Sequence, residues 1–320
     1  MAESQVYQQV QKHYSSAAKT NDDRYGRDVA TAFGYSKEEL ASIPQDANLG
    51  LSCGNPLALA QLREGETVID FGSGAGIDAF LAAKNVGPKG KVYGIDMNKA
   101  RMIYTPPLFF SPNTQTNPTG LQDMLARANI NKEKTGATAA NVTFVESQIT
   151  AVNLPDAVGD CIISNCVVNL VPEPEKQLAF NEMARLLKPG GRVALSDILT
   201  KKELTPELKE SIALYVGCIA GASQVADYER YLREAGFSDV LIVDAKNDLN
   251  IYTSALGNPE SASGGCCGEV KKPEPTPCCG PSPPKEERGP GIFSEGFKAD
   301  FKHIDFNEWA GSFKIYAVKN

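Results

Sequence analysis

The sequence predicts an α/β protein built around a parallel β-sheet. Between residues 67 and 198, short apolar runs alternate with stretches in which apolar residues recur at helical spacing, the pattern of repeated strand and helix units. The 320 residues are 42% hydrophobic and 22% charged, so the chain can bury a large core in one domain or two smaller ones. Three glycines follow the first apolar run, as expected where a strand turns into a helix beside a ligand.

Residues 1–60 are polar and mixed in composition, and we expect them to form an N-terminal helical extension that covers the functional sites. Helices are predicted over residues 4–18 and 36–43. The second begins with a capping box, because Ser36 and Glu39 stand three positions apart.

The main domain is expected over residues 61–245. Its strands are predicted from residue 67 and at 91–96, 141–145, 160–168, 192–198 and 240–244, and its helices at 77–84, 175–187, 206–219 and 224–234. In the helix at 175–187, Ala179, Met183 and Leu186 recur at helical spacing. The sequence KPGG that follows is typical of a helix end.

One stretch of this domain, residues 101–122, has neither helical nor strand periodicity. Structureless stretches longer than about 12 to 15 residues are uncommon inside compact domains. Without residues 100–122, the flanking sequences MNK and DMLARA would read as one helix. We interpret the segment either as an atypical surface insertion or as translated intron sequence left by a gene-model error, and the sequence of the transcript decides between them.

A small C-terminal region is expected over residues 246–320. Its linker, residues 257–290, is rich in Gly, Pro, Ser and Glu, a composition that cannot bury enough apolar surface to order itself. The linker carries two vicinal pairs, which either take part in thiol chemistry or have no role: Cys266, Cys267, Cys278 and Cys279. A last strand is predicted at residues 312–318.

Charge and composition exclude several classes of function. The formal net charge is -7 and no basic cluster is long enough to follow a phosphate backbone, which argues against nucleic acid as a partner. No run of about 18 apolar residues marks a membrane span. Eight cysteines without a secretory signal indicate reduced thiols rather than a disulfide scaffold, so we expect a cytoplasmic protein, and a monomer.

The sequence VIDFGSGAG, residues 68–76, predicts a ligand-binding turn between the first strand and its helix. Asp96 ends the next strand, where a carboxylate can bind the hydroxyls of a ribose. Together these features resemble the donor site of class I S-adenosylmethionine-dependent methyltransferases, which implies a Rossmann-like sheet with helices on both faces. The resemblance implies these donor-binding residues: Asp70, Gly72, Ser73, Gly74, Gly76, Asp96, Met97, Gln148, Ile149 and Asn165.

Three further motifs each carry a cysteine: LSCGNP at 51–56, ISNCVVNL at 163–170 and LYVGCIAGA at 214–222. Cys166 stands at the end of the fourth strand, and Cys218 and Cys53 stand on segments that can fold over the same edge of the sheet, Cys218 in the helix predicted after the fifth strand. Thiolates bind soft, thiophilic centres. Any one cysteine is more often inert packing, and Cys161, within an apolar strand, is our example.

The three cysteine motifs closely resemble those of arsenite methyltransferases, over residues 7–245. The resemblance implies that Cys53, Cys166 and Cys218 hold trivalent arsenic while its lone pair attacks the methyl group of S-adenosylmethionine, in arsenic detoxification. It also implies a thiol reductant, thioredoxin or glutathione, as co-substrate. Within this set, we expect Cys166 and Cys218 to act in every round, with Cys53 as the third ligand of inorganic arsenite.

One position departs from the family pattern, because Ala79 stands where a cysteine is usual. Either three cysteines suffice, or a tail cysteine substitutes, or the enzyme prefers arsenic that is already methylated. Two other functions stay open: a methyltransferase for a sterol or quinone ring, and a protein that sequesters metalloid without turnover. Of two further residues, we expect Tyr14 to close over the donor and Asp197 to be structural.

Overall fold

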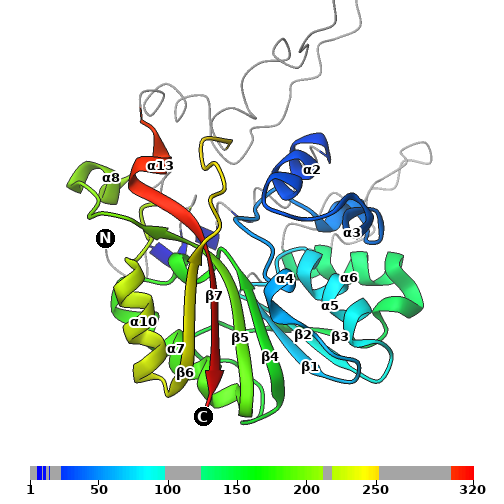
Figure 1. Ribbon diagram of the computed structural model, residues 1–320. Coiled ribbons are helices and arrows are strands. Elements are labelled where there is room, and N and C mark those ends of the chain that lie inside the picture. The colour runs from blue at the N-terminus through cyan, green and yellow to red at the C-terminus, as the bar shows by residue number, and fades with distance from the viewer. Residues whose placement is uncertain are drawn as a thin grey trace, which may run out of the picture.

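The computed structural model describes residues 6–8, 10, 11, 14, 23–97, 124–211, 218–251 and 304–320. At its centre is a seven-stranded sheet in the order β3-β2-β1-β4-β5-β7-β6 (Figure 1). Its strands are β1 (Thr67–Phe71), β2 (Lys91–Asp96), β3 (Val142–Glu146), β4 (Gly159–Asn165), β5 (Leu187–Thr200), β6 (Phe237–Asp244) and β7 (Ala310–Lys319). β1 to β5 pair in parallel, and β7 is antiparallel to both of its neighbours. The predicted parallel α/β sheet is therefore confirmed.

Helices cover both faces of the sheet (Figure 1). They are α2 (Asp23–Ala32), α3 (Lys37–Ala41), α4 (Leu57–Ala60), α5 (Ile77–Val86), α6 (Met124–Thr135), α7 (Lys176–Leu186), α8 (Pro206–Glu210), α10 (Val225–Glu234) and α13 (Phe306–Trp309). Short 3-10 helices lie at Gln45–Ala47, Gly136–Ala139, Val168–Leu170 and Glu173–Glu175. No helix within the described ranges has the length and apolarity needed to cross a membrane.

Alternation along the strands builds a core on each face. In β1, Ile69 packs with residues of α7 and α10, whereas Val68 packs with residues of α4 and α5. A third cluster lies at the carboxyl end of the parallel strands and contains Cys53, Cys166 and Cys218. In Figure 1, α2, α8 and α13 lie beyond this end of the sheet.

Several local predictions are confirmed, and others need correction. The capping box of α3 is present, with Ser36 accepting a hydrogen bond from the Glu39 N–H. The fourth strand ends at Asn165 rather than at residue 168, because Cys166 has φ +60° and leaves the extended conformation. Helices α2 and α13 were not predicted.

The C-terminal strand is part of the central sheet rather than of a separate region. β7 pairs with β5 from Arg192 to Thr200 and with β6 on its other side. Its central residue Ile315 is fully buried in the same cluster as Ile69. The boundary expected after residue 245 therefore does not divide the sheet, because β7 pairs with β5 on one side and with β6 on the other. The insertion at 100–122 and the linker at 257–290, with Cys266, Cys267, Cys278 and Cys279, lie outside the described residues.

Candidate active site

A pocket opens at the carboxyl ends of the parallel strands, where ligands bind in open α/β sheets. Of the predicted donor-binding residues, eight line it: Gly72, Ser73, Gly74, Asp96, Met97, Gln148, Ile149 and Asn165. Asp70 lies behind this lining in β1, and Gly76 is the N-cap residue of α5. The structure thus brings together segments that follow β1, β2, β3 and β4.

The turn after β1 requires glycine. Gly72 has φ +76°, and a Cβ there would lie 2.2 Å from a methyl carbon of Val167. At Gly74, φ is +52° and a Cβ would meet none of the described residues within 4 Å, so the backbone is open to them on that side. The Gly74 N–H donates to Asp96 Oδ2 at 3.0 Å, which fixes the turn against the end of β2. A ligand can therefore approach the turn backbone closely beside the Asp96 carboxylate.

The pocket fits a cationic, hydroxyl-bearing ligand such as S-adenosylmethionine. Ser73 Oγ lines it and, among the described residues, is buried without a hydrogen-bond partner. Asp70 Oδ2 is also buried with no hydrogen-bond partner in the part of the chain that the structure describes. The pKa of Asp70 is well above its ordinary value because of burial and the nearby charges of Asp78 and Asp96. A ligand hydroxyl would satisfy Ser73, and a positive charge would relieve the repulsion among these carboxylates.

The three predicted site cysteines converge beside this pocket. Cys53 and Cys166 form a disulfide across 113 residues of sequence, with a Cα–Cα distance of 5.7 Å. The Cys218 thiol donates to the Cys166 carbonyl oxygen at 2.9 Å, and all three cysteines are buried. Cys166 also lines the donor pocket. The prediction has three thiolates, whereas in the structure Cys53 and Cys166 are joined and only the Cys218 sulfur of the three is free.

Two of these cysteines have unusual backbone conformations. Cys166 has φ +60° and Cys218 has φ +65°, in the left-handed region that side chains other than glycine rarely adopt. Cys218 lies in a turn, so its predicted position on a helix was wrong. Such conformations persist where the surroundings hold them and are concentrated at functional sites. The Cys166 N–H donates to Ser196 O at 2.8 Å, and Asn169 Nδ2 donates to Cys218 O at 3.3 Å.

The surroundings of the Cys218 thiol favour its protonated form. Burial raises its pKa well above the ordinary value, and the Asp197 charge raises it further. A hydrogen bond with Tyr14 and the charge of Lys176 act in the opposite direction. A thiophilic ligand would therefore displace a proton on binding this sulfur. Burial also raises the pKa of Cys161, to about 12, but this residue lies inside β4 and outside the cluster of the three site cysteines.

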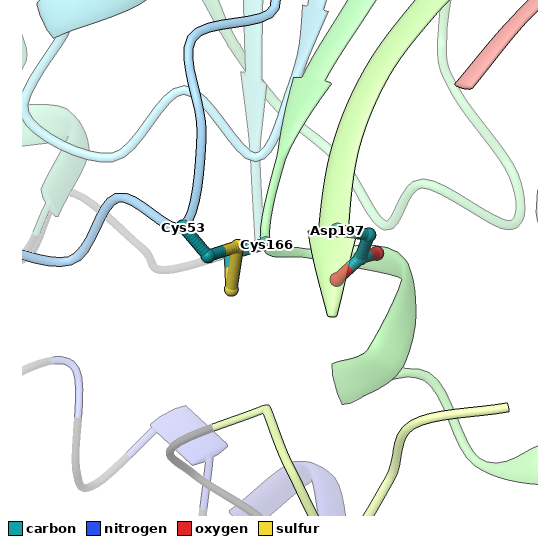
Figure 2. Close-up of side chains that lie close together, drawn as sticks. All are labelled: Cys53, Cys166 and Asp197. Atoms are coloured by element: carbon teal, nitrogen blue, oxygen red, sulfur yellow. A yellow bond between two sulfur atoms is a disulfide. The ribbon is translucent and has the colours of Figure 1, made fainter. Parts of the chain in front are cut away.

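Asp197 lies next to the disulfide (Figure 2). One of its carboxylate oxygens and the sulfurs of Cys53 and Cys166 all lie within 4.8 Å of one another. Both carboxylate oxygens already accept hydrogen bonds, Oδ1 from Asn169 and the Ile198 N–H and Oδ2 from the Tyr228 hydroxyl. Burial raises the pKa of Asp197 to about 6. These contacts agree with the structural role predicted for it.

Comparison with known proteins identifies the family. The chain matches a family profile described as a methyltransferase domain over residues 62–103 and 121–236. It is 42% identical over 231 residues to the arsenite methyltransferase of Halobacterium salinarum, which covers 68% of this chain and 52% of that protein. It is 30% identical over 258 residues to the arsenite methyltransferase of Aquipseudomonas alcaligenes, covering 78% of this chain and 67% of the relative. The chain belongs to the arsenite methyltransferase family.

Solved structures share the fold of this arsenite methyltransferase family member. An arsenic(III) S-adenosylmethionine methyltransferase from Chlamydomonas reinhardtii superposes with a TM-score of 0.51 at 23% identity, covering 91% of this chain and 73% of that one. A geranyl diphosphate C-methyltransferase from Streptomyces coelicolor gives 0.56 at 14% identity, covering 91% and 84%. The predicted Rossmann-like class I methyltransferase fold is thereby confirmed. The chain spans about half, 52%, of the length of its Halobacterium relative.

Two features of this chain concern the departures expected from its sequence. Residues 104–120 fall between the two stretches that the methyltransferase-domain profile matches, inside the segment predicted as an insertion. Ala79, where the resemblance led us to expect a cysteine, is fully buried in α5 and packs in the cluster on the α4 and α5 face of the sheet. The three site cysteines belong to the separate cluster at the strand ends.

Asn165 joins the donor wall to the cysteine site, a role that sequence reasoning missed. Its Nδ2 donates to Gly54 O at 2.9 Å, and its Oδ1 accepts from the Cys53 N–H at 3.1 Å. Nδ2 also lies 3.2 Å from Asp78 Oδ2, and the Tyr35 hydroxyl donates to Asp78 Oδ1 at 2.7 Å. Burial raises the pKa of Asp78 to about 6. Asp78 stands one position before Ala79, but neither its burial nor its contact with Asn165 can be seen in the sequence.

The N-terminal helix contributes to the pocket as well. Tyr7, Val10 and Tyr14 line it, and Tyr7 donates its hydroxyl to Glu175 Oε2 at 2.6 Å. Gln11 Nε2 donates to Met97 O at 3.5 Å, next to the predicted ribose site. The expectation that Tyr14 lies over the donor is therefore compatible with its position, and Tyr14 also contacts the cysteine cluster.

Proposed function

We propose that this chain transfers a methyl group from S-adenosylmethionine to trivalent arsenic held by cysteine thiolates. One observation carries the proposal: three cysteines from distant segments meet beside the donor pocket, and Cys166 belongs to both. Cys166 and Cys218 hold the arsenic in every round, and Cys53 is the third ligand for inorganic arsenite. A sterol or quinone methyltransferase would have no need of this grouping of thiols.

The donor is bound by the turn after β1 and by the ends of the neighbouring strands. S-adenosylmethionine, when bound, supplies an electrophilic methyl group. Asp96 accepts hydrogen bonds from its ribose, while the Gly72 to Gly74 backbone approaches its amino-acid end. Gln148 and Ile149 pack against its adenine beside Met97. Asp70 and Gly76 act from behind the pocket, through charge and through the start of α5.

The cysteines act mainly by positioning, because arsenic brings its own nucleophilic electron pair and requires no general base. Binding converts the Cys218 thiol to a thiolate and releases its proton. In the transfer, the arsenic lone pair becomes a new As–C bond while the S–CH3 bond breaks. The arsenic is then formally pentavalent, and two electrons must return before the next round.

The Cys53–Cys166 disulfide suggests that the thiols of these two cysteines supply the electrons. Two thiols release two electrons and two protons when they form one disulfide, which balances the reduction of pentavalent to trivalent arsenic. A thiol reductant, thioredoxin or glutathione, then reopens the disulfide. Because the substrate is held by reduced thiols, we place the reaction in the cytoplasm, as part of arsenic detoxification by a monomer.

The deciding test is arsenic speciation after incubation of the protein with arsenite, S-adenosylmethionine and a thiol reductant. Methylated arsenic should form continuously with the reductant, whereas protein that is first reduced and then separated from the reductant should stop after about one turnover. Properly folded protein that yields no methylated product contradicts the proposal. Calorimetry with the donor alone distinguishes the sequestering alternative, because a sequestering protein binds arsenite without binding the donor.

The same assay addresses Ala79. Separate incubations with arsenite and with monomethylated arsenite measure whether the chain prefers the methylated substrate. Three ligands suit arsenite, and two suit the monomethylated form, so faster turnover of the latter is expected if a missing fourth cysteine limits the first round. Equal turnover on both would remove this preference.

A further inference from the structure

We propose that Lys176 is a positioning residue for the Cys218 thiol. Its hydrogen bonds hold in place the loop that follows Cys218. The inference rests on the proposed function, since it concerns the arsenic affinity of the same site. The loop runs from Cys218 to Ser223 and connects the thiol to the start of α10. Lys176 contacts neither the disulfide nor the donor residues in any described interaction.

The Lys176 ammonium lies almost fully inside the protein, with 1% of the residue exposed. It donates to Gly221 O at 2.5 Å and to Ser223 Oγ at 2.6 Å, and it pairs with Glu173 Oε2 at 2.8 Å. An ammonium group has three donors and no acceptor. All three are used here, and two of them go to the loop.

Stability alone does not explain a lysine at this position. Burying a charge carries a desolvation penalty, and well-packed apolar residues often stabilise a protein as much or more. Lys176 is also the first residue of α7, where the helix dipole disfavours a positive charge. Its partner Glu173 is largely exposed, at 61%, so the carboxylate could be hydrated without the lysine.

The loop needs polar anchors because its backbone is strained at one end and it borders a cavity at the other. Cys218 has φ +65°, and Asn169 donates to its carbonyl. Beside the far end lies a cavity of about 380 Å³, whose lining includes Lys176, Gly221 and Ser223. Side chains therefore leave room into which the loop could shift. Asn169 and Lys176 hold its two ends.

The Lys176 anchor is itself fixed to the body of the protein. The Tyr231 hydroxyl, on α10, donates to Glu173 Oε1 at 2.5 Å, and the Thr200 N–H at the end of β5 donates to Ser223 O at 3.0 Å. A connected set of hydrogen bonds thus runs from α10 through Glu173 and Lys176 to the loop. The positive charge also favours the Cys218 thiolate, in agreement with a role near a thiol-bound substrate.

The test compares Lys176→Met, which keeps the apolar stem and removes the three donors, with Lys188→Met. Lys188 pairs with Asp160 at 2.7 Å near the opposite end of β5, with 45% of its side chain exposed. In reduced Lys176→Met we expect the arsenite KM and Kd to rise about tenfold, as for other groups that orient metal ligands. The donor Kd should change less than about twofold, and Lys188→Met should match the parent protein.

A second readout does not depend on arsenic. In a Cys161→Ala background, Lys176→Met should speed alkylation of Cys218 at least about threefold, because a released loop exposes a buried thiol. If the parent protein neither binds nor methylates arsenic, the proposed function fails. The alkylation rate would still report whether Lys176 keeps the loop closed over Cys218. Unchanged alkylation and arsenite affinity in folded Lys176→Met overturn the inference, as does equal weakening of donor and arsenite.

A milder change guards against a variant that fails to fold. Ser223→Ala removes one of the two loop acceptors of Lys176 and creates no charge. We expect arsenite binding weakened about two- to fourfold with donor binding unchanged, the size of one net hydrogen bond. No change in arsenite binding would overturn the inference.

Discussion

The donor half and the thiol half of this pocket are built in different ways. The centre of the donor half is one contiguous stretch, residues 68–76, whose backbone is shaped by glycines and fixed by Asp96, and the ends of the neighbouring strands complete it. The thiol half is assembled from Cys53, Cys166 and Cys218, with separations of 113 and 52 residues. Side chains and strained backbone define that half. A fold can therefore carry over its donor site almost unchanged while the substrate site depends on few individual residues.

The sharpest way to separate the halves is Cys218→Ser. Serine keeps a donor for the Cys166 carbonyl but has no soft sulfur for arsenic. We expect arsenite methylation to fall at least about 100-fold, beyond the losses typical of residues that only orient a ligand. Donor affinity by calorimetry should remain. Cys161→Ala, inside β4, is the matched control and should keep its activity, whereas loss of donor binding in Cys218→Ser would break the division.

The reverse separation uses Gly72→Ala. A Cβ at Gly72 would overlap Val167, and alanine at φ +76° costs about 1 to 2 kcal/mol by itself. Gly190 has the same φ, but a Cβ added there would meet nothing within 4 Å, so Gly190→Ala measures the backbone cost alone. Donor binding should weaken about tenfold or more in Gly72→Ala only, with arsenite binding to the reduced protein kept. Equal donor affinity in the two variants would contradict the close approach.

Sequence reasoning predicts these halves unequally. The donor turn and strands β1 to β5 follow from local periodicity and contiguous glycines, and they were found nearly in place. The helical conformation predicted at Cys218 was wrong, because a left-handed residue whose carbonyl is held by Asn169 has no local signature. Pairing of Cys53 with Cys166 is likewise a tertiary fact. β7 was recognised as a strand, but its place between β5 and β6 depends on distant pairing.

The hydrogen-bond network of Asn165, which connects the two halves, leads to a prediction about how the stability of the protein depends on pH. Asp78 contacts Tyr35 and Asn165 and has a pKa of about 6, above the value of about 3.9 in an unfolded chain. A raised pKa means that the stability this group contributes is present below about pH 4 and is lost as pH rises through about 6. Relative to Asp78→Asn, the parent protein should lose about 3 kcal/mol of unfolding free energy across this window.

Chemical denaturation at several pH values measures this difference. Asp160 provides a control of opposite sign: burial alone would raise its pKa, but the hydrogen bond from Lys188 gives a net lowering. Through Asp160, the parent protein should gain unfolding free energy as pH rises through the acid range. The Asp160→Asn variant should lack this gain. A parallel slope for both variants would refute the assignment to Asp78.

The smallest effect is expected from deleting residues 100–122, and it sharpens the comparison because in the sequence this segment follows residues of the donor half. The chain enters it just after Asp96 and Met97, and the family profile leaves residues 104–120 unmatched. If the segment is an insertion without a role, its loss should change donor affinity by less than about twofold, or ~0.4 kcal/mol, and leave arsenite affinity unchanged. Calorimetry with each ligand measures both. A large loss of donor binding alone would make the segment part of the donor site, whereas loss of arsenite binding would show that the two halves are coupled through it.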